Sequence, residues 1–83
     1  MRRILEGKIY DIEKAEKIAE SIICLEKNYK LILYKTPKGN YFEIGPNGKI
    51  EPLTKEEALK FCEEQGVDLD IIESEFSDLI EEA

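Results

Sequence analysis

The sequence predicts an α+β domain in which a small antiparallel sheet is accompanied by helices. Apolar residues recur at helical spacing in three segments, and they alternate at two-residue spacing in one segment between the first and second of these. Glycine and proline turn signals separate the segments. The length of 83 residues predicts a single domain, 1–83, with a thin core.

The N-terminal quarter predicts a short hairpin or strand followed by a helix. Residues 2–5 are expected to pair with 8–10 around a turn at Gly7. Asp11 has the character of a helix N-cap residue, which predicts a helix over 12–25. The expected apolar face of that helix consists of Ile12, Ala15, Ile18, Ala19, Ile22 and Ile23.

The middle of the chain predicts a three-stranded antiparallel meander over 28–53. "NYKLILYK" alternates with the period of a strand, "TPKGN" offers a tight reversal, and "NYFEI" resumes the alternation. "GPNGK" predicts a second turn before "KIEPL", in which Pro52 confines the third strand to an edge or an end.

Two helices are expected after the meander. Thr54 and Glu57 form a capping-box pattern, and Gly66 stands where a C-terminal cap belongs, so this segment predicts a helix over 55–65. A C-terminal amphipathic helix is predicted over 69–82. Its expected apolar stripe, which Ile71 does not fit, comprises Leu69, Ile72, Phe76, Leu79, Ile80 and Ala83.

Charge is distributed unevenly along the chain. The net charge is −7, and residues 63–83 hold nine acidic side chains but no lysine or arginine. Most of this charge fits a solvated helix face, but the helix macrodipole disfavours Glu81 and Glu82 at the C-terminal end. Stabilising cations could come from the chain itself, for instance Arg2, Arg3 or Lys8, or from another molecule.

The acidic segment is therefore the candidate interaction site. The residues expected to contact a protein partner, which is expected to be basic, are Glu73, Glu75, Asp78, Glu81 and Glu82. A helix of this kind can also imitate a nucleic-acid backbone. A homodimer through the apolar stripe or the sheet is the alternative, because a small core favours self-association.

The residue types required by most catalytic sites are missing. The chain has no histidine and no phosphate-binding glycine loop, so we expect a non-enzymatic protein without catalytic or cofactor-binding residues. An enzyme would have to rely on carboxylates, such as Glu43 beside Tyr41 and Tyr10. Cys24 and Cys62 lie in apolar runs and are expected to be reduced, with a disulfide between them as the alternative. Two ligands are too few for a structural zinc site.

Composition also bears on the setting of the protein. The negative net charge disfavours nucleic-acid binding, and the apolar runs are too short to span a membrane. The start of the chain lacks the apolar core of a signal peptide, so we expect a cytoplasmic protein. The abundance of Glu, Lys and Ile, with a single Gln, is typical of thermophile proteins.

Three segments carry a resemblance. "EGKIYDIEKAEKIA", "YKTPKGNYFEI" and "IEPLTKEEALKFCEE" occur in this order over most of residues 6–64. Together they resemble a group of small uncharacterised proteins of bacterial phages and mobile elements, whose pattern runs GKxYD…YxxxxGxYF…IxPL[ST]xEEA. Ile12 replaces the usual threonine after Asp11, and the loop before the hairpin is shorter. The resemblance implies a shared fold and mobile-element cargo that binds a host protein, and it implies no catalytic residues.

Overall fold

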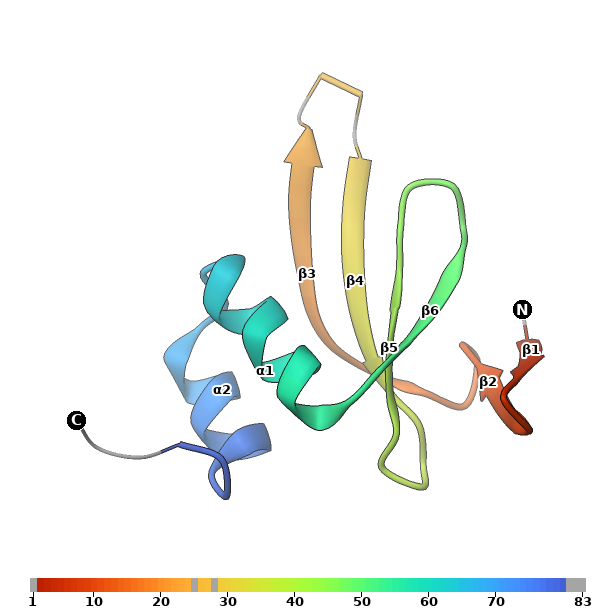
Figure 1. Ribbon diagram of the computed structural model, residues 1–83. Coiled ribbons are helices and arrows are strands. Elements are labelled where there is room, and N and C mark those ends of the chain that lie inside the picture. The colour runs from red at the N-terminus through yellow and green to blue at the C-terminus, as the bar shows by residue number, and fades with distance from the viewer. Residues whose placement is uncertain (1, 25, 28, 81–83) are drawn as a thin grey trace.

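Six strands precede two helices along the chain (Figure 1). The computed structural model describes residues 2–24, 26–27 and 29–80. The strands are β1 (Arg2–Leu5), β2 (Lys8–Asp11), β3 (Glu16–Cys24), β4 (Tyr29–Lys35), β5 (Tyr41–Ile44) and β6 (Ile50–Leu53), and the helices are α1 (Lys55–Glu64) and α2 (Leu69–Phe76).

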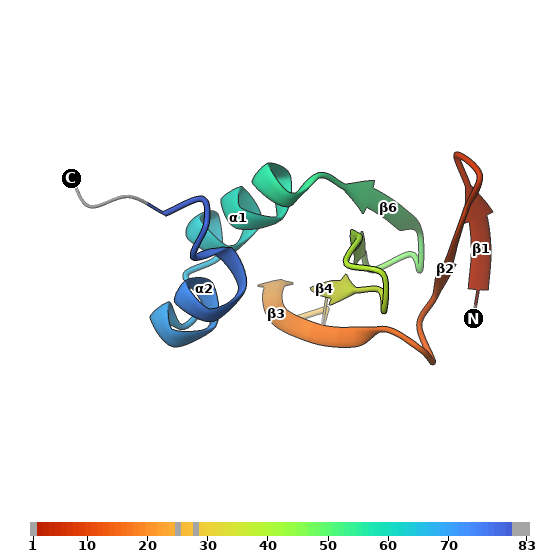
Figure 2. The same ribbon diagram turned by 90° about the horizontal axis from the view of Figure 1, so that it is seen from below.

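The architecture is a four-stranded antiparallel sheet with a two-helix layer on one side and a separate two-stranded hairpin at the other end. The order in the larger sheet is β3-β4-β5-β6, and β1 pairs only with β2. Both views place the helices and the hairpin at opposite ends of the molecule (Figures 1 and 2). The predicted order of helix, meander and two helices is therefore wrong, because strands occupy the first two thirds of the chain and the helices follow them.

The helix predicted over 12–25 is wrong because most of that segment forms strand β3. Lys17 pairs with Tyr34 of β4 and Ala19 pairs with Leu33, so Ile18 is the extra residue of a β-bulge. Because of the bulge, the consecutive residues Ile18 and Ala19 are both buried. Adjacent buried residues break the two-residue period of a strand and imitate helical spacing.

Asp11 does act as an N-cap residue, but the turn that it caps is a single one. The Asp11 carboxylate accepts a hydrogen bond from the Glu13 N–H at 3.0 Å, and the Asp11 carbonyl accepts one from the Ala15 N–H at 3.0 Å. The chain leaves the turn after Ala15 and enters β3, where pairing with β4 satisfies the backbone groups. Tertiary pairing thus overrides the local helix signal.

The N-terminal hairpin lies where the sequence places it. Arg2–Leu5 pairs with Lys8–Asp11, one residue longer than expected on the second strand. Glu6 and Gly7 have φ values of 52° and 75°, the left-handed conformation that a two-residue type I′ turn requires. Strands β4, β5 and β6 pair in sequence as a meander, to which β3 adds a fourth strand.

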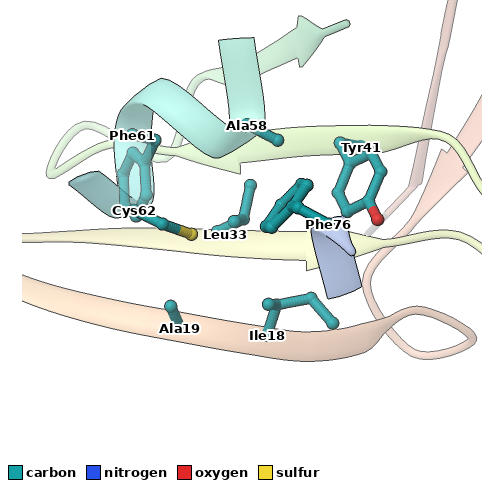
Figure 3. Close-up of a cluster of buried hydrophobic side chains, with 8 residues drawn as sticks. All are labelled: Ile18, Ala19, Leu33, Tyr41, Ala58, Phe61, Cys62 and Phe76. Carbon is teal, nitrogen blue, oxygen red and sulfur yellow. The ribbon is translucent and has the colours of Figure 1, made fainter. Parts of the chain in front are cut away.

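Each face of the larger sheet carries a buried apolar cluster. On the helix side, Leu33 and Phe76 are completely buried, and Tyr41 stacks on Phe76 with ring centroids 5.5 Å apart (Figure 3). On the other side, Phe42 stacks on Tyr34, and Tyr10 of the hairpin meets Phe42 edge-on at 5.4 Å. The hairpin is therefore anchored to the sheet through one of its two faces.

Helix α1 has the caps that its sequence predicts. The Thr54 hydroxyl accepts from the Glu57 N–H, and the Glu57 carboxylate accepts from the Thr54 N–H at 2.8 Å. Gly66 follows the helix with a φ of 64°, and the Val67 N–H donates to the Cys62 carbonyl, which closes the helix end.

Helix α2 is shorter than the predicted span of 69–82. It ends at Phe76 and continues as a turn in which the Leu79 N–H donates to the Phe76 carbonyl, while 81–83 lie outside the described residues. No basic residue lies in its last turn to stabilise the negative end of the helix dipole. The apolar face is also rotated from the predicted stripe, because Ile71 packs against the core whereas Leu69 is 65% exposed.

Candidate interaction surface

The candidate interaction residues divide into two groups with different roles. Glu75 belongs to the first group, because its Oε2 accepts from the Lys35 ammonium at 3.1 Å and from the Tyr41 hydroxyl at 3.3 Å. The Glu75 side chain is only 17% exposed. The hydrogen bond to Glu75 raises the pKa of Lys35, and burial raises the pKa of Tyr41. Glu75 therefore anchors α2 to β4 and β5.

Asp78 belongs to the same group. Its Oδ2 accepts a hydrogen bond of 2.9 Å from the Lys55 ammonium at the start of α1, and this hydrogen bond lowers the pKa of Asp78 and raises that of Lys55. The cations that meet the end of the acidic segment are thus Lys35 and Lys55. The expected candidates Arg2, Arg3 and Lys8 lie in the hairpin at the opposite end of the molecule (Figure 2).

The second group faces solvent around the connection between α1 and α2. Glu73 is exposed one turn after Leu69 on the outer side of α2, whereas Glu81 and Glu82 lie outside the described residues. Four further exposed carboxylates surround the connection, and none of them was among the candidates predicted from the sequence. The acidic face, as we define it, comprises Glu63, Glu64, Asp68, Asp70 and Glu73 around the exposed Leu69.

The acidic face has almost no neutralising partner within the chain. Among the described side chains, the one cation within 4 Å of any of its carboxylates is Lys60, 3.9 Å from Glu64. The Asp68 carboxylate also caps α2 by accepting from the Asp70 N–H at 3.1 Å. The arrangement offers negative charge around one exposed apolar side chain, which suits a basic surface with an apolar centre.

A separate groove lies beside the edge strand β6. It has a volume of about 720 Å³, and its lining includes Tyr10, Tyr41 and Glu43. Glu43 lies directly opposite Glu51 in the β5–β6 pair. Burial, then the charges of Glu51 and Glu57, raises the pKa of Glu43. Burial thus favours the protonated form of the Glu43 carboxyl, which lies in this groove beside Tyr41.

The remaining features offer little further chemistry. Among the described side chains, no group of three Cys, Asp or Glu residues is arranged to hold a metal ion. Neither described helix has the length and apolar character needed to cross a lipid bilayer. Comparisons with protein-family models, with curated proteins and with solved structures found no match.

Proposed function

We propose that this chain is a non-enzymatic protein-interaction module whose acidic face binds a basic surface on a protein partner. The observation that carries the proposal is a contrast within the acidic C-terminal segment. Glu75 and Asp78 form ion pairs with Lys35 and Lys55, whereas Asp70 and Glu73 stand exposed beside Leu69 with no cation within 4 Å among the described residues. Exposed charges of one sign raise the association rate with a partner of the opposite sign.

The resemblance to small phage and mobile-element proteins supports a setting for this interaction. It suggests cargo of a mobile element, acting in the cytoplasm on a host protein. The resembling segments end at Glu64, so Asp68, Asp70 and Glu73 of the acidic face lie beyond them. In this proposal the shared segments supply the scaffold, and the acidic face supplies the contact that is particular to this chain.

The test compares two variants of equal net charge. Asp70→Asn with Glu73→Gln removes two of the five negative charges of the acidic face, and Glu13→Gln with Glu26→Gln removes two exposed negative charges in turns outside the helices. Captured basic partners should be lost with the first variant and kept with the second. Binding should also weaken as ionic strength rises from about 0.01 M to about 1 M, because the Debye length falls from about 30 Å to about 3 Å. Partners held equally by both variants, or unaffected by salt, would contradict the proposal.

Self-association through the apolar face of α2 is the second candidate. Phe76, at the centre of that face, is completely buried within the protomer, and Ile71 and Ile72 pack against the same core. A homodimer through this face would have to undock the helix from its own sheet. The exposed acidic face requires no such rearrangement, and it is therefore the preferred surface.

A further inference from the structure

The hairpin at the far end of the molecule carries an uncovered apolar pair. Ile4 and Ile9 lie directly opposite each other in the β1–β2 register and are 68% and 53% exposed. The other face of the hairpin is covered, since Tyr10 is buried and Leu5 packs with it against the sheet. A two-stranded sheet is marginally stable by itself, and here one of its faces is left open to water.

Beside this pair lies a groove of positive charge. It has a volume of about 420 Å³ and runs between the hairpin and the turn that joins β4 to β5. Its one acid, Asp11, already accepts a hydrogen bond from the Glu13 N–H. The basic groove, as we define it, has as its cationic lining Arg2, Lys8, Lys14 and Lys38.

The basic groove and the acidic face are complementary in two respects. Each combines an exposed aliphatic centre, Ile4 and Ile9 on the hairpin and Leu69 on α2, with charges of a single dominant sign. An apolar centre within a charged rim is the usual arrangement of protein interfaces. The two surfaces lie at opposite ends of the molecule, so they cannot meet within one protomer (Figures 1 and 2).

We propose that the acidic face of one copy docks on the basic groove of a second copy. This inference rests on the proposed function and names the basic partner as another molecule of this chain. Leu69 then covers Ile4 and Ile9, while Asp70 and Glu73 face the lysines and arginine of the groove. Two copies in antiparallel orientation make both contacts at once, and the two-fold symmetry closes the assembly as a dimer.

The test reverses charge at each end of the full-length chain. Wild-type protein at high micromolar concentration and low salt should have the mass of a dimer in sedimentation or light scattering. Arg2→Glu with Lys8→Glu, and separately Asp70→Lys with Glu73→Lys, should each weaken the dimer by at least about tenfold in Kd. An equimolar mixture of the two variants should restore association, because both contacts then join opposite charges. A control pair, Lys27→Glu with Lys49→Glu, should remain dimeric, and circular dichroism should show every variant folded.

The failure of this inference differs from the failure of the proposed function. A wild-type monomer under these conditions overturns the second-copy inference, while salt-sensitive capture of a different basic protein still supports the function. A dimer that survives reversal of Asp70 and Glu73 shows that the acidic face is not the contact, and this outcome overturns the inference. Loss of association in both variants without recovery on mixing overturns it as well.

Discussion

Cys62 shows how the environment of one residue changes its chemistry. Its side chain lies under α1 against the sheet and is completely buried (Figure 3). Burial, followed by the negative charges of Glu63 and Glu75, raises the pKa of the thiol from 9.0 to about 11. Because the thiolate is the reactive form of cysteine, Cys62 is held in an inert state and acts as a small apolar residue.

This shift predicts an alkaline loss of stability. The folded state holds the Cys62 proton more tightly than the unfolded state, so the contribution is fully present below pH 9 and is lost as pH rises toward 11. We expect deprotonation of the Cys62 thiol to lower the free energy of unfolding by about 1–3 kcal/mol over this pH range. The measurement is urea unfolding in a Cys24→Ser background. Cys62→Ala should lack that part of the decrease, although the raised pKa values of Tyr10 and Tyr41 still contribute. Rapid reaction of Cys62 with a thiol reagent at pH 8 in the folded protein would contradict the assignment.

Candidate residues could be predicted from the sequence only in part. The carboxylate-rich segment indicated Glu73, which the structure leaves exposed. The sequence could not show that Glu75 and Asp78 are paired, because their partners Lys35 and Lys55 lie 40 and 23 positions away and are brought near only by the fold. For the same reason the sequence did not indicate Glu63, Glu64, Asp68 and Asp70, whose common surface depends on the packing of α1 against α2.

At the scale of elements, most turn and cap signals were reliable, whereas helical periodicity was misleading over residues 12–25. The capping box at Thr54, the turn at Gly7 and the cap at Gly66 all depend on neighbouring residues, and each is present. Strand β3 depends on pairing with β4 and on a bulge at Ile18, which no neighbouring residue reveals. The β-branched isoleucines of this segment favour a strand, and that signal was outweighed by the helical spacing.

Docking of α2 depends mainly on one aromatic side chain. Phe76 is completely buried between Tyr41 and the rest of the helix-side core. Phe76→Ala should lower the free energy of unfolding by about 3–5 kcal/mol, because it leaves a cavity in a small core. Leu69→Ala, at the exposed N-terminal end of the same helix, should change it by less than about 0.5 kcal/mol. Urea unfolding monitored by circular dichroism provides the comparison. Equal losses in the two variants would show that α2 does not pack as described.

For the whole molecule, the notable property is the separation of charge between two ends. The acidic helix layer and the basic hairpin lie at opposite ends of a flat molecule of 38 × 35 × 18 Å (Figure 2). The net charge of −7 keeps copies apart at long range, so any contact between them must be local and of opposite sign. The sequence indicated that acidic residues gather in the C-terminal segment, whereas only the fold brings Arg2, Lys8, Lys14 and Lys38 together along one groove.

The central claim is that carboxylates two positions apart on α2 have different roles, and it is tested most directly by neutralising them one at a time. Glu75→Gln should lower the free energy of unfolding by about 1–2 kcal/mol, because Lys35 and Tyr41 lose a partly buried anionic partner, and it should leave association unchanged. Glu73→Gln should leave stability within about 0.5 kcal/mol of wild type and should weaken association. Urea unfolding and sedimentation of both variants give this comparison. The reverse pattern, or the same response from both variants, would contradict the account.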